Sequence, residues 1–365
     1  MGDNKDLKIL YVGHDSLNTG AGVSTYIKNL MFYFKNSEAV TFRNKYCASI
    51  GQREFNLNAF NKFNEVIYFQ ITKIRKLISK IKNSDLIHDN PVAFYNFVFI
   101  LLCKIFNKQV VSTFHSNVDF KGASIKKKFE ILRYILLINL HMFLTNKLIL
   151  VTNSQKESLL KYILFKKLFR NKSEVIYNFI DSSGILKNRK PIKSLNIIIV
   201  GRLDGYKGFG DVLKLINILK NTSIKFHIFG EGILSDKIPK YRNVKYYGQV
   251  DNKELQRYYN LSNVLLFPSY SETFGLVILE AWSKGLTVVA SDLPVIREYF
   301  KEERNGYFFN PGDIIKMKNI LIYLKNNMGQ IEKIGKNNLQ DVKNFTDKKQ
   351  IPKYKAIYGS LLKNE

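Results

Sequence analysis

The chain has 365 residues, and its 57 lysines and arginines exceed its 30 aspartates and glutamates, which gives a formal net charge of +27 at pH 7. Apolar residues make up 45% of the chain and charged residues 24%, which is typical of a folded protein and excludes a disordered chain. This length predicts two domains, each large enough to bury a core of its own.

The sequence also argues against disulfide-rich, secreted and membrane-spanning proteins. The two cysteines, Cys47 and Cys103, have no paired spacing, which excludes a disulfide framework and a cysteine zinc site. Residues 1–8 are charged and lack the apolar stretch of a secretory signal. The most apolar stretches, Val92–Phe106 and Tyr134–Val151, are interrupted by polar residues and fall short of the ~20 apolar residues that a spanning helix needs. We therefore expect a soluble protein of a reducing compartment.

Short β-branched runs alternate with longer amphipathic stretches, which predicts an α/β protein with parallel sheets. Each half opens with an apolar strand that runs into a glycine, Gly13 or Gly201, and this repeat predicts two Rossmann-like halves. The expected strands are Leu7–Val12, Asp85–His88, Gln109–Thr113, Lys147–Thr152 and Glu174–Tyr177 in the first half, and Asn196–Val200, Lys225–Phe229, Val244–Tyr247, Val264–Pro268 and Thr287–Ala290 in the second.

Residues 1–182 are expected to form the first Rossmann-like domain and residues 195–349 the second. A polar, basic linker at residues 183–194 joins them. The segment 350–365 has helical spacing and is expected to pack back on the first domain. Two such domains would hold a ligand at the carboxyl ends of their strands.

Two glutamates follow the expected strand Val264–Pro268. A helix starting near Thr273 would direct its first N–H groups at a phosphate, and the carboxylates of Glu272 and Glu280 can accept hydrogen bonds from sugar and ribose hydroxyls. An isolated pair would more simply be a charge at a helix N-terminus and a surface residue. Within Glu-Thr-Phe-Gly-Leu and ahead of Ala281, the pair favours a binding site.

A basic loop, Gly201–Gly208, directly follows the expected strand Asn196–Val200. Arg202 could bind a diphosphate through its planar fork, and Lys207 could bind it as a point charge. An ordinary basic turn would explain Lys207 alone in so lysine-rich a chain, but it does not explain both cations at this spacing.

Two further elements lie at strand ends in the first half. Gly20 and Gly22 form a short glycine loop that could approach a phosphate, but it does not complete the dinucleotide fingerprint, so a nicotinamide enzyme is not expected. His115 ends the Gln109–Thr113 strand and could bind a sugar hydroxyl, with a purely structural role equally open. For His88 the structural role is favoured.

In chain order, these elements resemble the motifs of the retaining glycosyltransferases of family 4, which have the GT-B fold, an α/β architecture of two Rossmann-like domains with an interdomain cleft. The resemblance covers essentially the whole chain and is strongest from Asn196 to Asn310. Two departures are Gly20-Ala21-Gly22, where the family has a double glycine, and Asn178-Phe179, where it has Asn-Gly. The matching segments are Gly20–Val23, Thr113–Ser116, Val175–Asn178, Val200–Gly208, Phe229–Gly232 and Ser271–Ala281.

The resemblance implies an acceptor-binding first domain and a nucleotide-sugar-binding second domain. It implies that Glu280 binds the ribose, that Glu272 contacts donor-sugar hydroxyls, that Arg202 and Lys207 hold the diphosphate, and that His115 and Glu272 are catalytic. The other donor-binding positions that it implies are Gly20, Gly22, Gly230, Glu231, Thr273, Phe274, Gly275 and Leu276.

The expected reaction transfers a sugar from a nucleotide diphosphate, with UDP favoured, to a lipid-linked or surface-polysaccharide acceptor. The sequence contains no Asp-x-Asp, so we expect neither a metal nor another cofactor. Cations and a helix N-terminus would stabilise the leaving phosphate. Same-face transfer is implied by the resemblance alone. Alternatives are a basic nucleic-acid-binding protein, an epimerase or phosphorylase of the same fold, and a non-catalytic relative.

The excess of positive charge has three competing explanations: nucleic acid, an anionic membrane, and compositional drift in a lysine-rich chain. No nucleic-acid-binding signature accompanies the charge. Ile71–Lys82 has the pattern of a basic amphipathic helix, which by itself is more simply explained by packing on its own sheet than by a membrane interface. The basic segment around Lys126, Lys127 and Lys128, which follows His115, is the stronger candidate for a membrane contact. We therefore expect a cytoplasmic protein that is peripheral on the inner face of the cytoplasmic membrane and does not bind nucleic acid.

Overall fold

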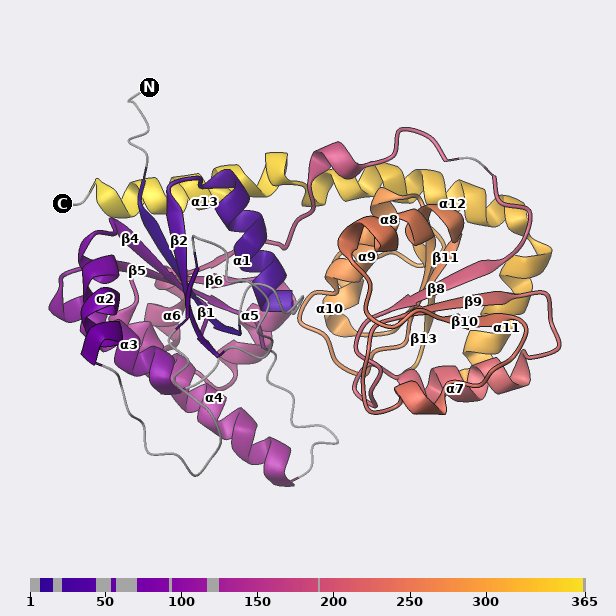
Figure 1. Cartoon of the computed structure of the whole chain (residues 1–365), viewed down its shortest axis with the longest axis horizontal. Coiled ribbons are helices and arrows are strands. Elements are labelled where there is room, and N and C mark those ends of the chain that lie inside the picture. The colour runs from indigo at the N-terminus through magenta and orange to yellow at the C-terminus, as the bar shows by residue number, and fades with distance from the viewer. Residues whose placement is uncertain are drawn as a thin grey trace. The chain divides into compact units, whose positions relative to one another are not determined.

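The computed structural model describes residues 7–15, 22–43, 54–56, 71–91, 94–116, 125–189 and 191–363. The chain divides into two compact units, one of residues 1–178 with 350–365 and one of residues 179–349 (Figure 1). The first unit ends at Asn178, four residues before the boundary expected from the sequence. Each unit is described below by itself.

The first unit contains a parallel sheet of seven described strands, in the order β3-β2-β1-β4-β5-β6-β7. Its central strands β4 and β5 are buried along almost their whole length because helices cover the sheet, and this burial includes the polar side chains at their carboxyl ends. The strands are β1 (Ile9–Asp15), β2 (Ser37–Arg43), β3 (Glu54–Asn56), β4 (Leu86–Asp89), β5 (Gln109–Phe114), β6 (Lys147–Leu150) and β7 (Ser173–Val175). The helices are α1 (Gly22–Tyr33), α2 (Ile71–Lys82), α3 (Phe94–Ile105), α4 (Ile125–Leu144), α5 (Asn153–Leu160) and α6 (Lys166–Lys172).

The second unit contains a parallel sheet of six strands in the order β10-β9-β8-β11-β12-β13. A cluster of aliphatic side chains between this sheet and its helices forms the core. The strands are β8 (Asn196–Val200), β9 (Lys225–Phe229), β10 (Val244–Tyr246), β11 (Val264–Phe267), β12 (Thr287–Ser291) and β13 (Gly306–Phe309). The helices are α7 (Phe209–Ile218), α8 (Asn252–Leu261), α9 (Leu276–Ser283), α10 (Pro294–Arg297), α11 (Ile314–Asn326) and α12 (Met328–Asp341).

The last helix, α13 (Asp347–Leu362), belongs to the first unit from Gln350 onward. Tyr354 and Tyr358 lie on its inner face and are almost completely buried. The hydroxyl groups of Tyr26 and Tyr354 lie 2.8 Å apart, and the hydroxyl of Tyr358 lies 2.6 Å from Nδ1 of His88. Two tyrosines one helical turn apart therefore attach α13 to α1 and to β4 of the first sheet.

Every strand expected from the sequence is present, and the two that open the second domain, β8 and β9, have the expected bounds. Three strands were missed: β2, β3 and β13. The first two residues of β2 are polar, and β13 begins at Gly306, whose φ of +148° allows its backbone to approach Val288 closely. Neither strand has the uninterrupted β-branched pattern on which the prediction depended.

Candidate functional site

Three loops meet at the carboxyl edge of the second sheet, because the strands that precede them, β9, β8 and β11, are neighbours. The backbone N–H of Leu203 donates to the carbonyl of Glu231 at 3.0 Å, which joins the loops after β8 and β9. The N–H of Tyr270 donates to the carbonyl of Tyr206 at 2.9 Å, which joins the loops after β8 and β11. Loops whose bonded residues, such as Tyr206 and Tyr270, lie 64 positions apart in sequence therefore form one local surface.

Two glycines make this close approach possible. Gly208 has a φ of +67°, and a Cβ added to it would overlap the carbonyl oxygen of Pro268, at the end of β11. Gly230 has a φ of +115°, and its Cβ would overlap the carbonyl of Gly201. Both positions therefore require glycine, because any side chain would clash and because the backbone is left-handed. Gly230, which was expected to contact the donor, thus allows the loops after β8 and β9 to pack closely. The side chain of the neighbouring Glu231 is exposed.

An ion pair connects the basic loop to the first glutamate of the pair. Nζ of Lys207 donates to Oε1 of Glu272 at 2.5 Å, and the hydroxyl of Ser269 donates to the same oxygen at 2.7 Å. The Glu272 side chain is 10% exposed and that of Lys207 33% exposed. The structure therefore brings these two predicted residues into direct contact at the rim of the sheet.

Arg202 has a more open position in the same loop. Its side chain is 64% exposed, and its Nε donates to Oδ2 of Asp204 at 2.5 Å. The other carboxylate oxygen of Asp204 accepts the backbone N–H of Lys207 at 2.9 Å. Asp204 was not among the predicted site residues, although it lies between the two cations in sequence, and it orients both of them.

The helix after Glu272 begins later than expected. The sequence predicted a start near Thr273, but α9 begins at Leu276, and Gly275 precedes it with a φ of +87°. The Phe274 ring is 2% exposed and stacks on Tyr299 with the centroids 5.1 Å apart, and the Tyr299 hydroxyl donates to the Phe274 carbonyl. The Phe274 side chain therefore packs inside the unit, and the backbone around Gly275 and Leu276 forms the helix N-terminus.

Glu280 lies in the second turn of α9 and is half-buried. Its Oε2 accepts a 2.9 Å hydrogen bond from the hydroxyl of Tyr259, a fully buried residue of α8. Burial raises the pKa of the Glu280 carboxyl, and the hydrogen bond from Tyr259 partly opposes that rise. Burial also raises the pKa of Tyr259 well above its ordinary value, so its hydroxyl stays a donor. No feature of the sequence indicated Tyr259, because a tyrosine in an amphipathic helix is most simply a core residue.

In the first unit, His115 lies just beyond β5 and is half-buried. Its Nε2–H donates to Oδ1 of Asn90 at 2.9 Å, and its ring contacts that of Tyr26 with centroids 4.6 Å apart. Burial lowers the pKa of His115 to about 3, so the imidazole is neutral at physiological pH. Gly22 is exposed at the first position of α1, whereas Gly20 lies outside the described residues.

The structural interpretation of His88 is consistent with its surroundings. Its Nε2 lies 2.7 Å from Oγ1 of Thr113, and its Nδ1 lies 2.6 Å from the Tyr358 hydroxyl. The side chain is fully buried, and burial, together with the nearby His115, lowers its pKa to about 3. Nδ1 thus attaches α13 to the sheet, and Nε2 connects β4 to the neighbouring strand β5.

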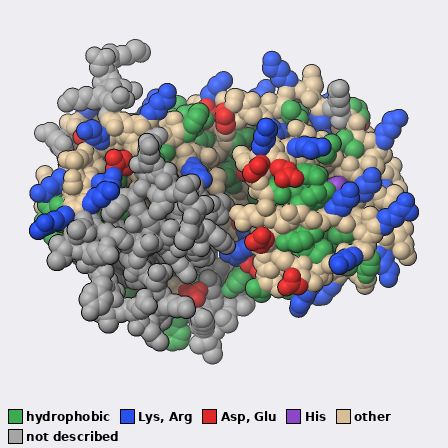
Figure 2. All heavy atoms as spheres, in the orientation of Figure 1, with side chains coloured by type: hydrophobic (Ala, Val, Ile, Leu, Met, Phe, Trp, Pro, Cys, Tyr) green, Lys and Arg blue, Asp and Glu red, His purple; other side chains and the backbone are tan. Residues whose placement is uncertain are grey.

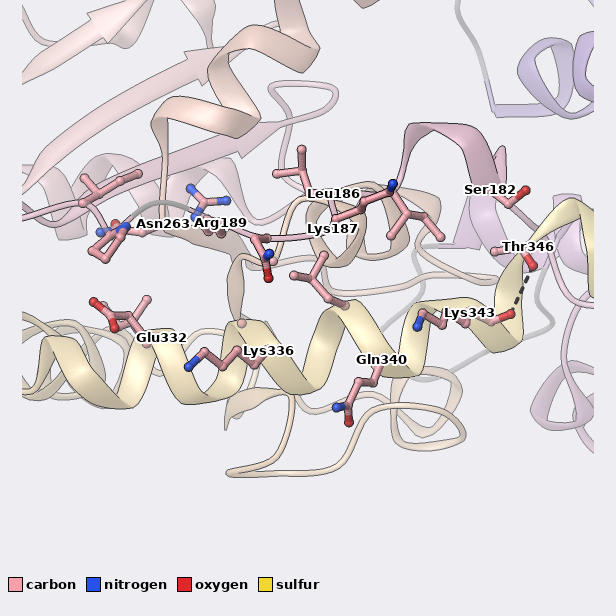
Figure 3. Close-up of a pocket in the computed structure, with 18 of the residues that line it drawn as sticks. Ser182, Leu186, Lys187, Arg189, Asn263, Glu332, Lys336, Gln340, Lys343 and Thr346 are labelled. Atoms are coloured by element: carbon pink, nitrogen blue, oxygen red, sulfur yellow. Dashed lines mark hydrogen bonds between the residues drawn. The ribbon is translucent and has the colours of Figure 1, made fainter.

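A cavity of about 840 Å³ lies elsewhere in the second unit, between residues 182–192 and α12 (Figure 3). Within the described part of the chain, none of the predicted site residues lines it. Its lysines, including Lys336 and Lys343, are exposed at its rim. Arg189 donates to the carbonyls of Tyr259 and Lys284, and burial lowers its pKa to about 10. Arg189 therefore holds the ends of α8 and α9, which carry Tyr259 and Glu280.

Among the described residues, no group of three or more His, Cys, Asp or Glu is suited to holding a metal. Within the same ranges, none of the helices is long and apolar enough to cross a membrane. On the face shown in Figure 2, the lysine and arginine side chains of the second unit are scattered rather than gathered in one patch. Lys128 is exposed, whereas the side chains of Lys126 and Lys127 lie outside the described residues.

Comparison with known proteins gives one family match, over residues 185–341, to the family described as "Glycosyl transferases group 1". An uncharacterized 41.2 kDa protein in the cps region of Klebsiella pneumoniae is 35% identical over 163 residues, which are 42% of this chain and 45% of that protein. The O-antigen biosynthesis glycosyltransferase WclY of Escherichia coli is 26% identical over 315 residues, covering 80% of this chain and 84% of WclY.

Solved structures match over nearly the whole chain. The structure of HepE from Anabaena in complex with UDP and glucose has a TM-score of 0.78 at 16% identity, covering 97% of this chain and all of that one. Sucrose-phosphate synthase from Thermosynechococcus elongatus has a TM-score of 0.76 at 18% identity, covering 98% of this chain and all of that one. At these identities the likeness shows the fold, which is the GT-B fold expected from the sequence.

Proposed function

We propose that this chain, which has the GT-B fold and whose residues 185–341 match the group 1 glycosyl transferases, transfers a sugar from a nucleotide diphosphate, with UDP as the favoured nucleotide. The family match covers the second unit, and the structure of HepE, which shares the fold, was solved with UDP and glucose. The acceptor proposed is a lipid-linked or surface-polysaccharide glycan.

The observation that carries this proposal is the contact between Lys207 and Glu272 beside the exposed Arg202. A diphosphate needs two or more positive charges at one place, and Arg202 and Lys207 belong to one loop in which Asp204 orients both. A transferred sugar needs hydrogen-bond acceptors for its hydroxyls next to that diphosphate, and Glu272 lies 2.5 Å from the Lys207 ammonium.

The N-terminus of α9 adds a second source of positive potential. The first N–H groups of a helix have no partner within it, and they favour negative charge at the helix start. Glu280, one turn further on, presents a carboxylate that Tyr259 holds in place, and a ribose can donate its hydroxyls to such a group. We assign Glu280 to the ribose and the backbone around Gly275 to the phosphate.

The proposed transfer retains the configuration of the sugar and needs no metal. The bond between the sugar C1 and the diphosphate oxygen breaks as the acceptor oxygen bonds to C1 on the same face. The acceptor proton passes to the departing diphosphate oxygen. Arg202, Lys207 and the α9 N-terminus stabilise the charge that develops on that oxygen. His115, its Nε2 held by Asn90, is proposed to hydrogen-bond a sugar hydroxyl.

The names of two similar proteins support a polysaccharide acceptor. WclY is named for O-antigen biosynthesis, and the Klebsiella protein is encoded in a cps region. A surface polysaccharide fits both names. By analogy, we place this chain in the assembly of a bacterial surface glycan, with the acceptor carried on a lipid.

Binding of UDP tests the function directly. Isothermal titration should show UDP binding that is weakened at least tenfold in Arg202→Ala and Lys207→Met, and a panel of sugar nucleotides should reveal slow hydrolysis of one donor. A matched control is Lys214→Met, an exposed cation of α7 outside the basic loop. Undiminished UDP binding in both site variants, or tighter binding of an oligonucleotide than of UDP at two salt concentrations, would reject the assignment.

A further inference from the structure

The outer face of α4 in the first unit is apolar and exposed to solvent. Phe129, Leu132, Leu136 and Phe143 are 64%, 53%, 58% and 51% exposed. Their spacing of three, four and seven residues puts them on one side of the helix, along about 21 Å of its length. Soluble proteins expose single large apolar side chains commonly, but a continuous row of this length indicates a surface that is covered in function.

The opposite face of α4 packs on the first sheet, and this packing determines which face of the helix is exposed. Ile131, Ile138 and Met142 are buried against Leu148 and Leu150 of β6. The helix is therefore apolar around most of its circumference while only one side is packed. A helix of this kind is normally buried on all sides. The exposed row of apolar side chains therefore indicates a surface that binds a partner.

The loop between α5 and α6 continues the apolar row. Leu164 and Phe165 are 78% and 53% exposed, and the Phe165 ring lies 5.1 Å from that of Phe143. Asn139 of α4 holds this loop, because its Oδ1 accepts the backbone N–H of Leu164 at 2.9 Å. The six side chains thus form one surface built from two segments, named here the α4 face.

Exposed cations surround the α4 face. Two of them, Lys128 and Arg133, lie on α4 itself, and Glu130 and Glu157 are the exposed acidic residues of α4 and α5. Lys172 is not counted, because its Nζ donates to the carbonyls of Met142 and Thr145. Other exposed cations lie in α6 or in the connection that follows α5: Lys161, Lys166, Lys167 and Arg170.

We propose that the α4 face docks on an anionic lipid bilayer, with its apolar side chains in the interfacial region and its cations on the headgroups. An apolar row bordered by lysine and arginine is the pattern of a helix that lies in the plane of a membrane. A second copy of the chain is a poorer partner, because each copy carries +27 and the same cations would face one another. This surface is independent of the transfer reaction proposed above.

Co-sedimentation of the full-length protein with vesicles tests this proposal. The vesicles are made of phosphatidylcholine alone or of phosphatidylcholine with about 30% phosphatidylglycerol, an anionic lipid content whose surface charge attracts basic segments. The combined change Phe129→Gln, Leu132→Gln and Leu136→Gln should lower the partition coefficient on anionic vesicles at least tenfold. The matched control, Ile218→Gln with Ile315→Gln, alters equally exposed apolar residues of the second unit and should bind as the wild type does.

Two further variants separate charge from apolar insertion. Changing Lys166, Lys167 and Arg170 to Ser should weaken binding to anionic vesicles and leave any weak binding to neutral ones unchanged. Changing Lys126, Lys127 and Lys128 to Ser tests the cluster expected from the sequence. Circular dichroism and UDP titration of each variant show that the fold and the donor site are intact, so loss of docking is distinguished from loss of the proposed function.

Wild-type binding by the glutamine variant would overturn the proposal, as would equal wild-type binding to neutral and anionic vesicles. Light scattering provides the remaining outcome. If the wild type is a dimer that the glutamine variant converts to a monomer, and neither binds vesicles, the α4 face joins two copies and the membrane assignment is wrong.

Discussion

The ammonium group of Lys207 donates a 2.5 Å hydrogen bond to the carboxylate of Glu272, a residue 65 positions further along the chain. Ser269 donates to the same carboxylate oxygen. A cation of a type suited to a diphosphate and a carboxylate of a type suited to sugar hydroxyls therefore form one hydrogen-bonded unit. The pair depends on the close approach of two loops, each of which follows a central strand of the second sheet.

Removing the side chain of Lys207 or of Glu272 should reduce activity, because each change removes a proposed ligand contact and also leaves the other residue without its partner. We expect Lys207→Met and Glu272→Gln each to lower kcat/KM about 10–150-fold, since a hydrogen bond to a charged group contributes ~1.5–3 kcal/mol. Because the residues contact each other, the double variant should lose less than the sum of the two single effects. Steady-state kinetics of all four proteins measures this, and strict additivity would show that the two residues act independently.

Tyr259→Phe should weaken donor binding without touching the ligand. The change removes the hydrogen bond that orients Glu280, so KM for the sugar nucleotide should rise about 3–10-fold, the equivalent of ~1 kcal/mol, with kcat nearly unchanged. Glu280→Ala should abolish most activity, and it also leaves the buried Tyr259 hydroxyl unpaired, so its Tm should fall. A Tyr259→Phe enzyme with wild-type KM would show that Tyr259 does not position Glu280.

Gly208→Ala should damage the site through the backbone. The alanine methyl group would overlap the Pro268 carbonyl, and the alanine backbone would have to adopt a left-handed φ of +67°. The basic loop must therefore move away from β11. We expect UDP affinity to fall at least tenfold and Tm to fall by a few degrees. Gly205→Ala in the same loop is the control, since its Cβ has no neighbour within 4 Å. Equal behaviour of the two variants would contradict this account.

Transfer should persist in excess EDTA. In the proposed mechanism, Arg202, Lys207 and the α9 N-terminus neutralise the leaving diphosphate, and the described residues include no acidic cluster to hold a metal. The measurement is the initial rate of transfer with and without about 5 mM EDTA, which is a large excess over contaminating metal. Complete loss of activity that Mn²⁺ restores would disprove the metal-independent mechanism.

His88 should make the first unit less stable in acid. Its folded pKa of about 3 lies below the ordinary value of 6.5, so between these values the unfolded chain binds a proton that the folded chain does not. Stability from this group is complete above pH 6.5 and decreases as the pH falls, by about 2 kcal/mol between pH 7 and pH 5. Urea unfolding at both pH values should show a smaller difference in His88→Gln than in the wild type. An equal difference would show that His88 titrates normally.

Much of the fold could be read from local sequence patterns. The strands β8 and β9 were predicted to the residue, because a short β-branched or aromatic run between polar segments has few alternatives. The glycines, the basic loop and the glutamate pair were identified from residue type and spacing. The direct contact between Lys207 and Glu272 was not, because it depends on which strands are neighbours in the sheet.

The sequence by itself determined the alternation of strands and helices, the two Rossmann-like halves and the residue types available for a nucleotide sugar, since these follow from hydrophobic period and from glycine positions. Only the tertiary structure decided that α9 starts at Leu276, that Tyr259 orients Glu280, and that Phe129 and Leu136 face solvent while Ile131 is buried. The reason is physical: the period of a segment determines which side chains share a face, but packing on the sheet determines which face is buried and which long-range partners meet.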